Sequence, residues 1–105
     1  ATGFHVIVPA LVEGFTEDIV GPSRDLGLAM RRGLDSVGLE RSSYVAGGLH
    51  ARDDLGTLNL SDVPIVLLEL GNMRNPAEAR RMATPEGQQV FADGVVAGIR
   101  AYLER

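Results

Sequence analysis

The sequence predicts an α/β fold with a layered, mostly parallel or mixed sheet flanked by helices. Two segments of strand character, 3–9 and 65–70, alternate with stretches of helical periodicity, which is the order found in α/β proteins. The second is a continuous apolar run that ends at Glu69, and such runs are typical of strands covered on both faces in parallel sheets. Two strong strands are few for such a sheet. We therefore expect residues 1–105 to be the second, C-terminal half of a larger single domain, with no second domain.

Composition excludes several classes of protein. The chain has 105 residues, of which 45% are hydrophobic and 23% are charged, as in ordinary globular domains. Its net charge of −4 argues against nucleic-acid binding, which requires a basic face. Because no Cys is present, a disulfide, a thiolate nucleophile and a cysteine-based metal site are excluded. No apolar run is long enough to cross a bilayer, so membrane insertion is not expected.

The first part of the chain is predicted to form a strand, a loop and a helix. Residues 3–9 are rich in β-branched side chains and end at a proline, as a short strand does. Residues 10–21 form a loop that is either a solvated connection or the border of a groove. A helix is predicted over 22–37, with Pro22 in its first turn and Gly38 as its C-terminal stop. Its core stripe consists of Leu26, Met30, Leu34 and Val37.

The middle segment, 41–63, is the least regular part. A short strand is predicted at 42–45, followed by a tight turn at Gly47 and Gly48. We expect the residues after this turn to form a loop near the edge of a functional site.

The last part of the chain is predicted to form two helices. Asn75 is placed as the cap of the first, with Pro76 inside it and Glu78 positioned to reach back to the helix start. This helix ends near Met82, and a longer helix begins at Thr84 and continues to the C-terminus. Glycines lower the helix propensity of the longer helix, so we expect it to pack closely against the sheet.

Glu69 is the first candidate for chemistry, because functional groups in open α/β sheets gather at the carboxyl ends of strands. Partial desolvation there raises the pKa of a carboxylate and suits general acid–base catalysis. The alternative is a structural Glu that accepts hydrogen bonds from the turn that follows. Position alone leaves both interpretations open.

The two histidines are weaker candidates. His5 lies inside a strand next to apolar residues, which favours a core or edge histidine over a metal ligand. His50 follows the glycine turn, and its spacing from His5 matches no local metal motif.

Three polar residues are candidates for contacting or orienting a substrate. Arg52 belongs to a charged cluster that is typical of a solvated surface; if it lies beside Glu69, it orients Glu69 or a substrate carboxylate. Asn72 and Arg74 follow Glu69 in the turn, where a cap or surface role is the alternative.

The segment 60–78 resembles the C-terminal signature of zinc-dependent N-acetylmuramoyl-L-alanine amidases. It contains the pattern Pro-x-hydrophobic-Leu-hydrophobic-Glu-hydrophobic-Gly with Glu69 at its acid, then a turn ending in Asn-Pro and a further acid. Residues 82–85 and the last helix continue the match. Residues 3–8 resemble the strand that follows the last metal-binding histidine of the family. The resemblance covers nearly the whole chain but only the second half of the family's domain.

This resemblance implies a peptidoglycan hydrolase. Such enzymes cleave the amide bond between N-acetylmuramic acid and L-alanine of the stem peptide, outside the cytoplasmic membrane in the periplasm or cell wall. One zinc ion, held by two His and one Glu, polarises the carbonyl and activates a water. Glu69 then corresponds to the catalytic carboxylate, acting as general base and acid.

The zinc ligands of the family all precede the segment that begins at Gly3, and His5 and His50 do not align with them. We therefore expect no metal site in this chain, an N-terminal half as the partner that holds zinc, and no activity of this chain alone. The alternative is a non-catalytic peptidoglycan-binding or regulatory domain that kept the fold. The presence of Glu69 favours the enzyme.

Overall fold

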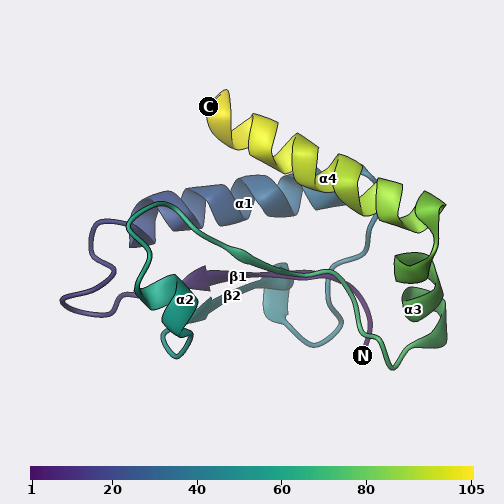
Figure 1. The fold of residues 1–105 in the computed structure, drawn as a ribbon, viewed down its shortest axis with the longest axis horizontal. Helices are drawn as coiled ribbons and strands as arrows, with labels where there is room; N and C mark the ends of the chain where they lie inside the picture. The colour runs from purple at the N-terminus through teal and green to yellow at the C-terminus, as the bar shows by residue number, and fades with distance from the viewer.

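The computed structural model describes residues 1–105 and confirms an α/β fold with a small mixed sheet flanked by helices. The helix α1 (Val20–Ser36) lies along one face of the sheet, and α4 (Pro85–Leu103) crosses over α1, so the chain forms three layers (Figure 1). The sheet has the order β2-β1-β3. Its strands are β1 (His5–Pro9), β2 (Leu49–Arg52) and β3 (Leu67–Glu69).

Strand β1 and helix α1 form where the sequence predicts them. All five residues of β1 are buried, and Val6 and Val8 face α1 at Gly27, which has no side chain to separate helix from strand. The helix begins two residues before the predicted start. It ends before Gly38, whose φ of 84° is the left-handed conformation that glycine adopts at low cost. The predicted stripe is confirmed, since Met30 and Leu34 are buried and Leu26 and Val37 contact the same core.

The strand predicted at 42–45 is wrong, and β2 forms later in the chain. The hydroxyl of Ser42 accepts hydrogen bonds from the backbone N–H groups of Tyr44 and Val45, which folds this segment into a turn. The predicted glycine turn follows as a 3₁₀ turn, η1 (Ala46–Gly48). Strand β2 then runs parallel to β1, with α1 in the connection between them, as parallel pairing requires.

The apolar run before Glu69 is not a strand covered on both faces. Only Leu67–Glu69 form β3, which pairs antiparallel with β1 at the edge of the sheet. Leu68 packs toward the core, whereas Leu67 and Glu69 are exposed. The prediction failed because apolar side chains occupy both faces of this strand, which hides its alternation in the sequence.

The C-terminal helices start where their caps predict. The side chain of Asn75 accepts the N–H groups of Ala77 and Glu78 at the start of α3 (Pro76–Ala83). Thr84 caps α4 in the same way through the N–H of Gly87. The glycines of α4 are predicted to approach the sheet, but Gly94 and Gly98 lie against α1 and Gly87 lies against Arg81 of α3.

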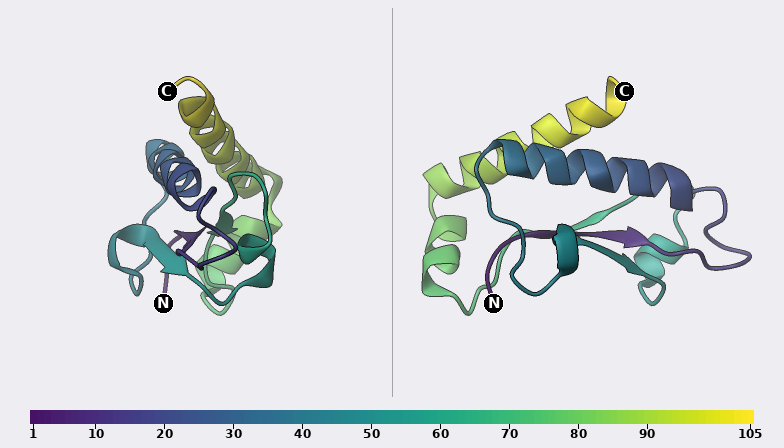
Figure 2. Two further views of the ribbon diagram at one scale, coloured as in Figure 1. Left: turned by 90° about the vertical axis from the view of Figure 1, so that its left-hand side faces the viewer. Right: turned by 180° about the vertical axis from the view of Figure 1, so that it is seen from behind.

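The core lies between the sheet and the two long helices. Phe4, Val6 and Val8 contribute from the strand side, and they meet side chains from α1 and from the first half of α4. The second half of α4 extends away from the sheet (Figure 2), and there Ile99 and Leu103 are exposed. No helix is both long enough and apolar enough to span a bilayer.

Candidate functional site

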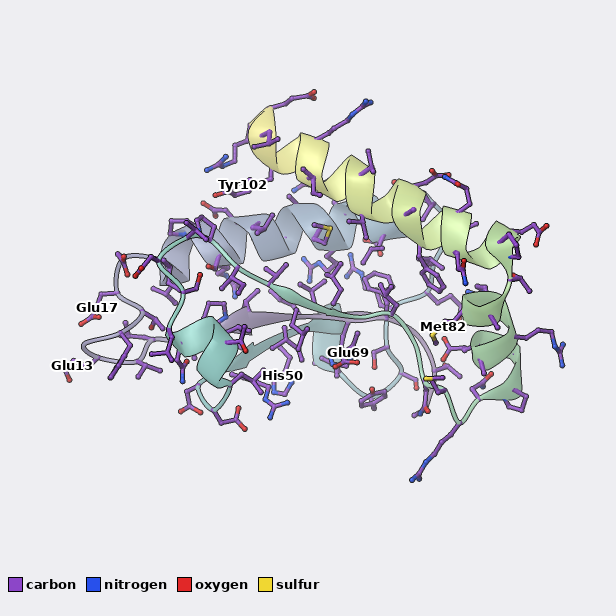
Figure 3. The ribbon with its side chains drawn as sticks, in the orientation of Figure 1. Glu13, Glu17, His50, Glu69, Met82 and Tyr102 are labelled. Atoms are coloured by element: carbon purple, nitrogen blue, oxygen red, sulfur yellow. The ribbon has the colours of Figure 1, made fainter.

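The two faces of the sheet differ in chemistry. Side chains alternate along a strand, so those adjacent to the α1-facing valines of β1 point to the other side. The register pairs His5 with Glu69 and Ile7 with His50. The face away from α1 therefore carries His5 from β1, His50 and Arg52 from β2 and Glu69 from β3. Figure 3 shows His50 and Glu69 on this side of the sheet.

A shallow hollow on this face collects the titratable side chains. It contains two imidazoles, one guanidinium and one carboxylate, with apolar and aromatic side chains between them. The lining residues are His5, Ile7, Tyr44, Val45, His50, Arg52 and Glu69. Glu69 and Arg52 thus line the same hollow from opposite sides, so Arg52 does not lie beside Glu69 as a joint role would require, and both histidines and Tyr44 lie between them.

Glu69 is exposed at the end of β3, and its carboxylate is free of the turn that follows. The turn amide that a structural Glu would bind, the N–H of Asn72, donates instead to Glu78 Oε1 at 3.0 Å. The interpretation of Glu69 as an anchor for this turn is therefore not supported by the hydrogen bonds. Glu69 was expected at the edge of the sheet where the carboxyl ends of parallel strands meet. Because β3 runs antiparallel to β1, Glu69 instead lies opposite His5 at the start of β1.

His5 is the most buried polar side chain of the hollow, with 7% of the residue exposed. Its ring meets that of Tyr44 edge to face, with the ring centroids 5.6 Å apart. Nδ1 of His5 is buried and has no hydrogen-bond partner within the chain. Burial lowers the pKa of His5 from 6.5, and Glu69 opposes this shift because its negative charge favours the imidazolium.

Arg52 is positioned by its neighbour Asp54. Nη2 of Arg52 lies 2.7 Å from Oδ2 of Asp54 and Nε lies 2.9 Å from Oδ1, so the two side chains form a bidentate ion pair. This pair raises the pKa of Arg52 and lowers that of Asp54, and Glu69 adds to the shift of Arg52. Arg52 is therefore a fixed positive charge at the side of the hollow opposite Glu69.

The other two candidates lie outside the hollow. The N–H of Arg74 donates to Oδ1 of Asn72 at 2.9 Å, which is a local turn contact. Both residues belong to the segment between β3 and α3 and do not line the hollow.

Two residues near the candidate site are not predicted from the sequence. Tyr44 was assigned to a strand, yet it packs on His5 at the hollow. Glu78 was expected to reach back to the start of its own helix, but its carboxylate instead accepts the N–H groups of Gly3 and Asn72. No local signal identifies the partner of Glu78, because Gly3 is distant in the sequence.

The side chains of this chain do not form a metal site. Zinc sites in hydrolases use three protein ligands, and no group of three His, Cys, Asp or Glu side chains converges anywhere in the chain. The two histidines and Glu69 share the hollow without the geometry of a ligand set. The donor set therefore does not fit a resident zinc ion.

A family comparison and a related protein both match nearly the whole chain. The profile of a family described as N-acetylmuramoyl-L-alanine amidase matches residues 1–101. An N-acetylmuramoyl-L-alanine amidase of Mycobacterium tuberculosis is 38% identical over 102 residues, which cover 96% of this chain and 42% of the relative.

Two solved structures share the fold. Crystal structures of N-acetylmuramyl-L-alanine amidases from Mycobacterium smegmatis and Mycobacterium abscessus match with TM-scores of 0.89 and 0.88, at 38% and 40% identity. The matches cover 98% and 97% of this chain but 47% and 48% of those chains. This chain thus spans less than half the length of the relatives that it matches.

Proposed function

Because this chain belongs to the N-acetylmuramoyl-L-alanine amidase family, we propose that residues 1–105 form the C-terminal half of a peptidoglycan-cleaving catalytic domain. In this proposal the complete domain consists of this chain and an N-terminal half. It hydrolyses the amide bond between N-acetylmuramic acid and L-alanine of the stem peptide. The substrate is extracytoplasmic, so the protein works in the periplasm or cell wall.

The observation that carries this proposal is the position of Glu69. Its carboxylate lies on the face of the sheet away from α1, beside His5 and across the hollow from Arg52. The N–H of Asn72 in the turn that follows donates to Glu78 instead, so the carboxylate of Glu69 is available for proton transfer.

We assign to Glu69 the role of general base and then general acid. Its carboxylate accepts a proton from the attacking water while the water oxygen bonds to the lactyl carbonyl carbon. The C–N bond then breaks, and the proton passes from Glu69 to the nitrogen of L-alanine, which leaves as an amine. A group that accepts and returns the same proton accelerates such a reaction by roughly 10²- to 10⁴-fold.

Arg52 is proposed to bind a carboxylate of the stem peptide. Its guanidinium is already held by Asp54, so little side-chain freedom is lost when an anion binds beside it. Asn72 and Arg74, in the turn beyond β3, are proposed only to border the substrate from the end of the strand.

The proposed zinc dependence requires ligands that residues 1–105 do not supply. Since the donor set within residues 1–105 does not fit a metal site, the zinc ligands have to come from the N-terminal half. The chain by itself is then inactive, and its contribution is the carboxylate of Glu69 and the surface around it.

The experiment is Glu69→Gln in the complete domain. The amide keeps the shape of the side chain but cannot accept the proton, so kcat on a muropeptide is expected to fall by roughly 10²- to 10⁴-fold with zinc content unchanged. Glu13→Gln is the matched control, because Glu13 is exposed in the loop before α1, far from Glu69 (Figure 3). Turnover of Glu69→Gln within a few-fold of wild type would exclude the assigned role.

The second candidate is a non-catalytic peptidoglycan-binding or regulatory domain with the same fold. The same assay separates the two functions. A complete domain that binds muropeptide, releases no L-alanine-containing peptide and is indifferent to Glu69→Gln is a binder.

A further inference from the structure

We propose that Glu78 is the positioning residue for Glu69: its buried carboxylate ties the start of β1 to the turn after β3 and so fixes the catalytic side chain. This inference rests on the proposed catalytic role of Glu69 and adds to it the residue on which its geometry depends. Glu78 is 9% exposed, which is unusual for an acidic residue on a short helix.

The carboxylate of Glu78 joins two segments that are distant in the sequence. The N–H of Gly3 donates to both of its oxygens, at 3.0 Å to Oε2 and 3.2 Å to Oε1. The N–H of Asn72 donates to Oε1 at 3.0 Å. Hydrogen bonds from backbone N–H groups to an ionised carboxylate are stronger than those between neutral groups.

The two segments that Glu78 joins flank the pair formed by His5 and Glu69. Gly3 lies two positions before His5, Asn72 lies three positions after Glu69, and His5 and Glu69 face each other in the antiparallel ladder. The N-terminus and the turn before α3 run side by side at the same end of the molecule (Figures 1 and 2). Glu78 therefore adds a cross-link just beyond the last rung of a three-residue strand.

The surrounding residues are adapted to this contact. Asn75 already caps α3, so the carboxylate of Glu78 is not needed at its own helix start. A Cβ at Gly71 would lie 3.1 Å from Oε2 of Glu78 and 2.7 Å from Cε of Met82, which indicates how closely the turn lies against α3. The turn is thus shaped around the Glu78 side chain.

Leu68 and Leu70 anchor β3 in the core, but the backbone of its carboxyl end has no ladder partner beyond Glu69. β3 pairs with β1 only over His5–Ile7, and the carboxyl end of β3 carries Glu69. Loss of the cross-link lets this end move, and a displacement of the order of 1 Å in a catalytic group lowers kcat by about 10²-fold. The proposed substrate contact of Arg52 on β2 is unaffected, so KM should change little.

The test compares Glu78→Gln and Glu78→Asp with wild type in the complete domain. The amide offers one acceptor oxygen, and Asp is one methylene too short to reach both amides. We expect kcat on a muropeptide to fall roughly tenfold or more in each variant, with KM within threefold and zinc content unchanged. Amide exchange should accelerate at Gly3, at Asn72 or at both in each variant, since at least one of these N–H groups loses its acceptor.

Two controls separate positioning from stability. Glu86→Gln makes the same change in the first turn of α4, where the carboxylate contacts neither β1 nor β3, and should keep wild-type kcat. Asn75→Ala removes the cap of α3 and costs about 1 kcal/mol, yet leaves the Glu78 carboxylate in place; it should lower the melting temperature but not kcat.

The outcomes distinguish this inference from the proposed function. Folded Glu78 variants with kcat within twofold of wild type, or a kcat loss in Asn75→Ala equal to that in Glu78→Asp, would overturn the positioning role alone. If Glu69→Gln retains turnover in the same assay, the proposed function itself fails, whatever the Glu78 variants do.

Discussion

At the scale of single residues, the imidazole of His5 shows how burial at the hollow affects protonation. Burial lowers its pKa from 6.5, Glu69 raises it, and His50 and Arg52 lower it further. As the pH falls below about 6.5, the unfolded chain takes up a proton at His5 while the folded chain resists until its lower pKa is reached. The contribution of His5 to stability is therefore present above pH 6.5 and is lost as the pH falls toward the folded-state pKa.

The variant His5→Gln should remove this dependence. Between about pH 7 and pH 5, the free energy of unfolding should decrease less in His5→Gln than in wild type, as measured by urea denaturation at a series of pH values. His50→Gln is the matched control, because His50 is exposed on the same face. Equal pH slopes for wild type and His5→Gln would contradict the prediction.

Glu69 and Glu78 show that a sequence motif gives the positions of two acids but not their hydrogen-bond partners. The sequence contains both and places them at the end of a strand and the start of a helix. It does not say which carboxylate binds the amides of the turn between them. In the structure the carboxylate of Glu78 accepts the N–H of Asn72, and also that of Gly3. The carboxylate of Glu69 accepts neither.

At the scale of elements, the crossing of α1 and α4 depends on glycines that face each other. A Cβ at Gly33 would overlap backbone atoms of Gly94 and Gly98, and a Cβ at Gly98 would lie 2.6 Å from the sulfur of Met30. Neither backbone can move without separating the two helices. The close packing of α4 was predicted, but the predicted partner, the sheet, was wrong, because a glycine is equally suited to approach a sheet or a helix.

The variant Gly33→Ala should therefore destabilise the fold, although alanine is the better helix former. We expect a loss of about 1–3 kcal/mol in the free energy of unfolding, typical of overpacking. Gly21→Ala in the first turn of the same helix meets no atom within 4 Å and should be neutral or slightly stabilising. Thermal and chemical denaturation of both variants measure the difference, and a Gly33→Ala protein as stable as Gly21→Ala would refute the close crossing.

Among the strands, β1 was predicted, β3 was predicted as a strand ending at Glu69 but not in its direction, and β2 was missed. β1 combines β-branched residues with burial on both faces, which gives a clear local signal. β2 begins after a turn that Ser42 stabilises, and β3 is short and apolar on both faces. In both cases the position and direction of the strand follow from pairing with β1 rather than from local preference.

At the scale of the whole molecule, the separation between Glu69, the proposed catalytic carboxylate, and the proposed zinc ligands is testable. The isolated 105-residue polypeptide should not bind zinc tightly, because no three ligand side chains converge in it. Equilibrium dialysis followed by metal analysis gives the stoichiometry. Any weak binding should disappear in the double variant His5→Gln, His50→Gln, whereas tight one-to-one binding by the polypeptide would contradict the proposal.

The sequence by itself determined the helices α1, α3 and α4 and the family of this protein, but not the short helix α2 (Gly56–Asn59). The caps at Asn75 and Thr84, the stop at Gly38 and the stripe of α1 depend on residues within a few positions of one another, so they can be read without a fold. The motif around Glu69 is equally local, and it identified the amidase family.

Only the tertiary structure decided how the site is assembled. It set the antiparallel pairing of β3, the contact of Glu78 with Gly3, and the face on which His5, Arg52 and Glu69 meet. These features join segments that are distant in the sequence. They depend on which strand edge and which buried amide remain available once the core has formed, and no local preference encodes that.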